Sequence, residues 1–133
     1  MVLLVVEDEP LILMAIQDAL EASGYVVLPT TSGAEAITVL DNRHREIAGI
    51  ITDVRLGSGP NGWQVSRRAR ELRPDIPVVY ATGDSAPDWP AFGVPQSILV
   101  PKPYVPEQML DAISAVMVSA VGRPRPLSGT SPK

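Results

Sequence analysis

The sequence of 133 residues contains no cysteine and only one histidine, His44. Without cysteine the chain can form no disulfide bond, thiolate metal site or thiol nucleophile. His44 stands in a polar stretch, residues 41–46, that is typical of a solvated loop, so a zinc site is not expected. Long apolar runs are also missing. The apolar run at residues 2–6 is short, since three acidic residues follow it at once, and no basic segment precedes it. We therefore expect a cytoplasmic protein with neither a signal peptide nor a membrane span.

Basic residues are few and do not cluster. The formal net charge is −4, and all fifteen acidic residues lie within residues 1–121, whereas three of the eleven basic residues lie beyond that point. A protein that binds nucleic acid needs a basic face to neutralise phosphates. We therefore expect no nucleic-acid partner and no DNA-binding output domain.

Five short aliphatic segments alternate with segments whose apolar residues recur at helical spacing. The predicted strands are residues 2–6, 25–28, 47–53, 78–81 and 98–100. The predicted helices start at Pro10, at Ser32 in a capping box with Glu35, at Trp63 and at Pro106. Regular alternation of strand and helix predicts an α/β protein with a parallel sheet and right-handed crossovers. The length and the 45% of hydrophobic residues suit one domain with a substantial core.

Two stretches are unlike the rest. Residues 85–96 contain Pro87, Pro90 and Pro95, and an interior proline costs a helix roughly 3 kcal/mol, so the fourth helix is expected to be short or irregular. After residue 121 the composition changes to Gly, Pro and Ser. The sequence thus predicts a folded domain over residues 1–121 and a disordered tail over residues 122–133.

Polar residues suited to a reactive site follow four of the five predicted strands. In chain order they are Glu7 and Asp8, Asp53, Thr82 and Lys102. If the strands take the order 2-1-3-4-5 of a flavodoxin-like, doubly wound (βα)5 sheet, these ends meet at one crevice. Each residue has an ordinary structural explanation of its own, and Asp53 taken alone is at least as typical of a turn as of a reactive site. Their occurrence together at successive strand ends favours a site.

This group of side chains suits phosphoryl transfer to an aspartate. Three neighbouring carboxylates repel one another unless a cation lies between them. Hard oxygen ligands with room for water and phosphate oxygens suit Mg²⁺. A carboxylate can act as the nucleophile, a lysine can pair with the resulting anion, and a threonine hydroxyl can donate to a phosphoryl oxygen.

Four segments resemble the receiver domain of two-component response regulators. They are residues 5–10 (VVEDEP), 51–56 (ITDVRL), 81–83 (ATG) and 102–103 (KP). They occur in the family's order, and the resemblance covers about residues 2–121. Each short motif is weakly specific alone, whereas the set is highly specific. The resemblance implies a signalling phosphoprotein that acts as a switch, a shuttle or a phosphate sink, and not an enzyme in the usual sense.

The resemblance also implies a role for each strand-end residue. Asp53 would take a phosphoryl group from the phosphohistidine of a sensor histidine kinase or of a histidine phosphotransfer protein. The implied Mg²⁺ ligands are Glu7, Asp8, Asp53 and the backbone carbonyl of Arg55. Thr82 would move toward the phosphoryl group, and Lys102 would pair with that group. The peptide bond between Lys102 and Pro103 would be cis. A downstream protein partner is a further possibility.

Three features depart from the usual family pattern. Many receivers have a switching Tyr or Phe three residues before the lysine, where this chain has Leu99. The loop after Asp53 is one residue longer than usual, and prolines interrupt the fourth helix. With residues 80–83 (YATG), these features resemble the single-domain receivers of the FATGUY subgroup, although residues 84–85 fit the end of that motif poorly. We therefore expect phosphorylation to be read out without the common Thr–Tyr coupling.

Two alternatives remain open. A small hydrolase with an aspartyl-phosphate intermediate usually has a second acid two residues after the nucleophile, where this chain has Arg55. Such an enzyme also needs a cap over its substrate, and no insertion here is long enough to form one. The chain could instead be a receiver excised from a hybrid histidine kinase. Met1 directly before the first strand and the polar tail favour a standalone protein.

Overall fold

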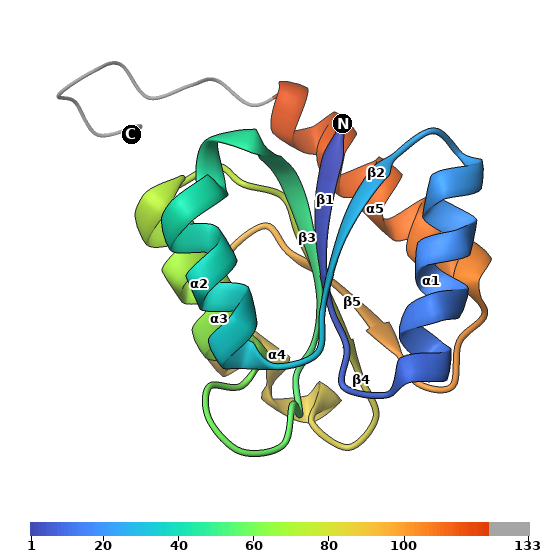
Figure 1. Ribbon diagram of the computed structural model, residues 1–133. Helices are drawn as coiled ribbons and strands as arrows, with labels where there is room; N and C mark the ends of the chain where they lie inside the picture. The colour runs from blue at the N-terminus through green and yellow to red at the C-terminus, as the bar shows by residue number, and fades with distance from the viewer. Residues whose placement is uncertain (123–133) are drawn as a thin grey trace, which may run out of the picture.

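The computed structural model describes residues 1–122, which form one five-stranded parallel sheet in the order β2-β1-β3-β4-β5. The strands are β1 (Val2–Val6), β2 (Val26–Thr30), β3 (Ile47–Asp53), β4 (Val78–Thr82) and β5 (Ile98–Pro101). The helices are α1 (Pro10–Ala22), α2 (Gly33–Arg43), α3 (Gly62–Leu72), α4 (Trp89–Phe92) and α5 (Pro106–Gly122), with 3₁₀ turns η1 (His44–Glu46) and η2 (Ala86–Asp88). Helices α1 and α5 cover one face of the sheet, and α2 and α3 cover the other (Figure 1). The predicted flavodoxin-like fold and strand order are confirmed.

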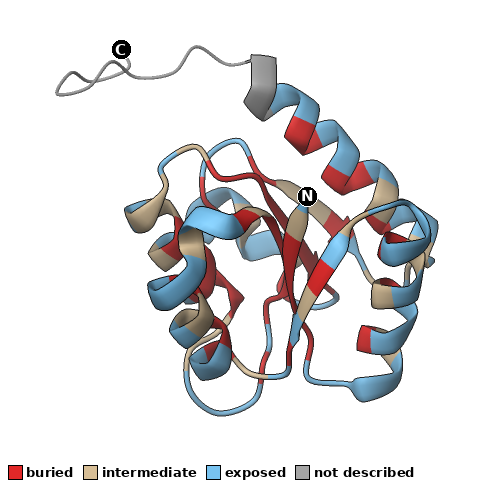
Figure 2. Cartoon of the chain, turned by 45° about the horizontal axis from the view of Figure 1, so that its top comes forward, coloured by how far each residue is buried: buried red, intermediate tan, exposed pale blue. Residues whose placement is uncertain are grey.

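The central strands are buried on both faces, which explains their continuous aliphatic sequences. One core cluster lies between the sheet and the pair α1 and α5, and a second lies between the sheet and the pair α2 and α3. Figure 2 shows buried residues along the strands and exposed residues on the outer sides of the helices. The parallel registers place Val6 beside Thr52 and Asp53 beside Ala81. The carboxyl ends of β1, β3 and β4 are therefore adjacent.

Local sequence signals explain most helix starts, with one correction. The Ser32 hydroxyl accepts a hydrogen bond from the Glu35 N–H at 3.1 Å, as predicted for the start of α2. The Glu35 carboxylate, however, accepts from the N–H of Thr31 at 2.9 Å, so the predicted reciprocal capping box is wrong. The reciprocal box occurs at α3 instead, where Asn61 and Gln64 each accept a hydrogen bond from the backbone N–H of the other.

The connection between β4 and β5 has little helix. Helix α4 has four residues and follows the three-residue turn η2, which confirms the prediction of a short fourth helix. The edge strand β2 contains Pro29, one residue beyond the predicted strand end, because an edge strand tolerates a residue that cannot donate to the ladder.

The described residues include the whole predicted domain but only the first residue of the predicted tail. The ordered elements run from β1 to Gly122, the last residue of α5 and the first residue of the predicted tail. Residues 123–133 of that tail lie outside the described residues, so the predicted disorder stays a prediction. Among the helices of residues 1–122, none is long and apolar enough to cross a membrane.

Candidate functional site

Three carboxylates gather at the carboxyl edge of the sheet. Glu7 directly follows β1, and Asp53 is the last residue of β3. The pairing of Val6 with Thr52 places these two strand ends side by side. One carboxylate oxygen each of Glu7, Asp8 and Asp53 lies within 4.8 Å of the others. Glu7 and Asp53 are only 1% and 5% exposed, whereas Asp8 is open to solvent. The fold thus brings together the three acids singled out from the sequence.

A lysine at the end of β5 reaches this acidic group. Lys102 Nζ donates a hydrogen bond to Oδ2 of Asp53 at 2.8 Å, and the Lys102–Pro103 peptide is cis, as the resemblance implied. The backbone N–H of Lys102 donates to the carbonyl of Thr82 at 2.9 Å. Thr82 is buried at the end of β4, where its hydroxyl accepts a hydrogen bond from the N–H of Ser85 at 3.3 Å. Lysine and threonine therefore border the acids on the side of β4 and β5.

Burial and charge shift the pKa values of these groups. Burial raises the pKa of Glu7 to about 7, the Asp53 charge adds to the rise, and a hydrogen bond from the Glu9 N–H opposes it. Burial also raises the pKa of Asp53, although its hydrogen bond with Lys102 and the lysine charge act against the rise. For Lys102, burial acts to lower the pKa, but the hydrogen bond and charge of Asp53 outweigh burial and the pKa is raised. The contact between Lys102 and Asp53 therefore opposes the effect of burial on the pKa of both groups.

The donor set fits a hard divalent cation. Three carboxylates offer oxygen atoms within a few ångströms of one another, and the exposed position of Asp8 leaves access for water. Mg²⁺ prefers oxygen ligands and keeps several waters, so it combines well with one or two carboxylates and phosphate oxygens. A bound cation would also remove the repulsion that contributes to the raised pKa of Glu7. These residues therefore fit Mg²⁺ by the chemistry of their side chains.

Two features of the site were missed in the sequence. The exposed side chain of Arg55, given a role only through its backbone carbonyl, pairs with Asp84 at 3.0 Å and links the loops after β3 and β4. Arg55 and Asp84 each lie two residues after the end of a strand, and their opposite charges at neighbouring strand ends could have predicted this ion pair. Tyr104 lines an apolar pocket and has a buried hydroxyl without a hydrogen-bond partner among the described residues. No local pattern indicated that burial.

Comparison with known proteins agrees with the fold and with the order of the motifs. The family model described as the response regulator receiver domain matches residues 3–114. The chain belongs to this family. Receivers are components of two-component signalling and are generally not classical enzymes. Receiver domains bind Mg²⁺ at an acidic pocket, and the acids in the corresponding place here are Glu7, Asp8 and Asp53.

Individual relatives of this receiver include both solved structures and curated proteins. The crystal structure of a response regulator receiver protein from Sinorhizobium medicae is 37% identical, covers 90% of this chain and 95% of its own, and superposes with a TM-score of 0.86. Response regulator SaeR from Staphylococcus aureus is 29% identical over 117 residues, which are 86% of this chain and 50% of SaeR. The chain therefore spans about half the length of this curated relative. The receiver domain of the hybrid histidine kinase CckA has a TM-score of 0.72 and covers 88% of this chain and 99% of its own. Its sequence is only 23% identical, so this likeness shows the fold alone.

Proposed function

We propose that Asp53 is the phosphoacceptor of this receiver and takes a phosphoryl group from a phosphohistidine on a sensor histidine kinase or a histidine phosphotransfer protein. The observation that carries the proposal is the contact between Lys102 and Asp53 at the edge where Glu7 and Asp8 also lie. A buried carboxylate held by one cation at a strand end has the position and the charge partner that a carboxylate nucleophile needs.

The transfer makes one bond and breaks one bond. A carboxylate oxygen of Asp53 attacks phosphorus, the new P–O bond of an acyl phosphate forms, and the P–N bond to the donor imidazole breaks. The electron pair of the P–N bond stays on the imidazole nitrogen. Lys102, already hydrogen-bonded to Asp53, is placed to pair with the added negative charge. The Thr82 hydroxyl, which now accepts from Ser85, can rotate to donate to a phosphoryl oxygen.

The residues that would hold Mg²⁺ are Glu7, Asp8, Asp53 and the backbone carbonyl of Arg55. When bound, the ion supplies positive charge that offsets the phosphoryl oxygens during transfer. Glu7 must be ionised to act as a ligand, and a cation beside it favours the ionised form.

The receiver has exposed apolar side chains that a donor protein could contact. Leu11 and Met14 of α1 are 80% and 56% exposed, and Val105 in the segment before α5 is 54% exposed. Exposed apolar side chains near a reactive group are typical of a surface that binds another protein. We infer that the donor packs on this face while its phosphohistidine reaches Asp53. The phosphorylated receiver then serves as a switch, a shuttle or a phosphate sink, and a downstream partner would bind it in that state.

Labelling with a small phosphodonor tests the assignment of Asp53. After incubation with acetyl phosphate and Mg²⁺, intact-mass measurement should show one added phosphate per chain, which hydroxylamine removes. Asp53→Asn should take up none, whereas Asp18→Asn, an exposed acid on α1, should be labelled like the wild type. Equal labelling of Asp53→Asn would refute the assignment. Sustained turnover of the phosphodonor without a retained label would favour the hydrolase alternative instead.

A further inference from the structure

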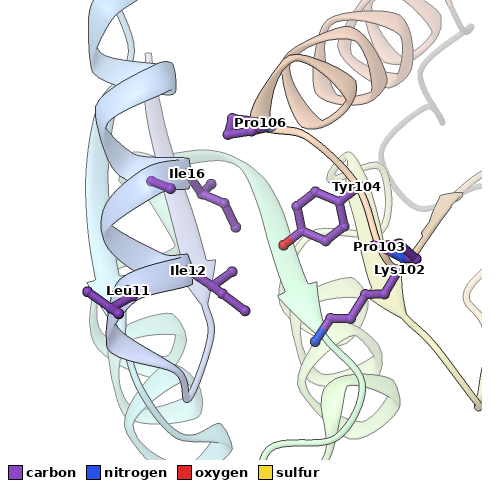
Figure 3. Close-up of a pocket in the computed structure, with 8 residues that line it drawn as sticks. Leu11, Ile12, Ile16, Lys102, Pro103, Tyr104 and Pro106 are labelled. Atoms are coloured by element: carbon purple, nitrogen blue, oxygen red, sulfur yellow. The ribbon is translucent and has the colours of Figure 1, made fainter.

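Tyr104 lies between the phosphoacceptor edge and an apolar pocket. The pocket has a volume of about 500 Å³ and lies between α1 and the segment that leads from β5 into α5. Figure 3 shows the Tyr104 ring facing Ile12 and Ile16 of α1 across this space, with the hydroxyl at the end of the ring nearer to α1. Because one water occupies about 30 Å³ in the liquid, the pocket leaves room for the ring to move.

The hydroxyl of Tyr104 is buried and has no hydrogen-bond partner among the described residues. A buried donor without an acceptor is unfavourable, because it has lost its hydrogen bond to water and gained none. Rotation of the side chain into the pocket would return the hydroxyl to water but would expose part of the ring. Such a second position would compete with the one in the structure, and a small change in the surroundings would be enough to select between them.

The buried position places the hydroxyl near the acidic edge. Burial raises the pKa of the Tyr104 hydroxyl, and the charges of Glu7, Asp53 and Glu9 raise it further, so the group stays protonated and can donate. A phosphoryl group on Asp53 would bring new acceptor oxygens to this edge. Lys102, two residues before Tyr104, is hydrogen-bonded to Asp53, so the short segment that carries Tyr104 is joined to the phosphoacceptor.

We propose that Tyr104 is a two-position side chain that reports phosphorylation of Asp53. In the resting receiver it exchanges between the buried position and the pocket, and phosphorylation holds it in the buried position. There its hydroxyl donates to an oxygen of the phosphoryl group. The inference rests on the proposed function, and it supplies an aromatic readout that Leu99 cannot. Since Tyr104 forms one wall of the pocket, its position alters the apolar face between α1 and α5.

Fluorine NMR of the full chain labelled with 3-fluorotyrosine tests the exchange directly. The chain has three tyrosines, and the Tyr104 signal is the one lost in Tyr104→Phe. We expect this signal to be broad in the resting protein and to shift and sharpen with Mg²⁺ and beryllofluoride, a phosphoryl mimic. The Tyr25 signal should not change, because its hydroxyl contacts Ser114 at 3.5 Å, away from the acidic edge. A Tyr104 signal with the same position and width in both states would overturn the inference.

The substitution Tyr104→Phe tests the hydrogen bond, since it keeps the ring and removes only the hydroxyl. Its affinity for beryllofluoride should be about tenfold weaker than that of the wild type, as expected for one hydrogen bond to a charged group. Tyr25→Phe should bind like the wild type. Equal affinity of Tyr104→Phe and wild type would contradict the inference.

Acetyl phosphate labelling of the same proteins separates this inference from the proposed function. If Asp53 is labelled and the Tyr104 signal does not respond, only the inference about Tyr104 fails. If the wild type takes up no phosphate, the proposed function fails and the inference fails with it. Labelling of Asp53 together with a responding Tyr104 signal supports both.

Discussion

Two connections that border the acidic edge are held in different ways. Helix α5, which follows β5, has a continuous apolar side packed against the sheet. Over the part of α5 whose burial is described, residues 106–119, the buried residues are Met109, Ala112, Ile113, Val116 and Met117. The connection between β4 and β5, residues 83–97, contains the four-residue helix α4, which has no buried residue. A regular helix thus stabilises one connection through many apolar contacts, whereas the other buries fewer apolar side chains, chiefly Val94 and part of Trp89.

Polar side chains hold much of residues 83–97. The Tyr80 hydroxyl accepts a hydrogen bond from the N–H of Val94 at 3.0 Å and also bonds to the hydroxyl of Ser66. The Trp89 Nε1 donates to the hydroxyl of Ser97 at 2.9 Å. A segment that depends on a few such bonds can open locally at lower cost than a helix with a buried apolar face. The comparison therefore predicts that single substitutions affect the two connections in different ways.

The largest effect is expected from Ile113→Ala in α5. Ile113 is fully buried, so its truncation removes apolar contacts and leaves a cavity, and the free energy of unfolding should fall by about 3 kcal/mol. Urea denaturation measures this loss. Val118→Ala, at a position of α5 that is 72% exposed, should change stability by less than about 0.5 kcal/mol. Similar losses for the two variants would show that the buried side of α5 is not what holds the helix.

The edge between the two connections should respond to pH. In metal-free protein Glu7 has a pKa of about 7 against an ordinary 4.5, so between these values the folded state holds a proton that the unfolded chain releases. Stability is therefore lost as the pH rises through this range, by up to about 3 kcal/mol, since one pKa unit corresponds to about 1.4 kcal/mol. Thermal melting in the presence of a chelator at pH 4.5 to 8 measures the loss. The difference in stability between wild type and Glu7→Gln should follow the same curve, and a difference that is independent of pH would contradict the assignment.

A smaller but more local effect is expected from Tyr80→Phe. The substitution keeps the ring but leaves the Val94 N–H without its acceptor, which should cost about 1.5 kcal/mol. The Ser66 hydroxyl loses its bond to Tyr80 but still donates to the Trp63 carbonyl. Amide hydrogen exchange should become faster at Val94, while the amides of α5 keep their protection relative to global unfolding. Tyr25→Phe, with an exposed hydroxyl contact, serves as the control. Unchanged exchange at Val94 would show that the Tyr80 hydroxyl does not hold this segment.

The smallest expected effect is the response of residues 84–96 to phosphorylation. This segment follows Thr82 directly, so movement of Thr82 toward a phosphoryl group should order it. We expect its amides to exchange about fivefold more slowly with beryllofluoride and Mg²⁺, a change of about 1 kcal/mol. Trp89 and the 51% exposed Phe92 would then form the surface that a partner reads. Equal exchange in the two states would leave Tyr104 as the remaining candidate for readout.

The sequence by itself determined the order of elements and the positions of the strand ends. Strand and helix periods are local properties, and the rules for parallel sheets leave few ways to arrange five alternating units. For that reason the sequence alone is enough to place Glu7, Asp53 and Lys102 at one edge of the sheet. The same reasoning predicted the short fourth helix, because proline excludes a long one in any surroundings.

Contacts between side chains far apart in the chain were decided only by the tertiary structure. The bond from Val94 to Tyr80 and the buried hydroxyl of Tyr104 depend on how neighbouring elements pack, and a local period gives the face of an element but not the distant group that a side chain meets there. The loop after β3 is a further case, since a Cβ on Gly33 at the start of α2 would meet the carbonyl oxygen of Pro60 at 2.1 Å. Other residues with the same helix, strand or turn preference would suit each of these positions locally. Only close packing with distant parts of the chain requires the residue that is found there.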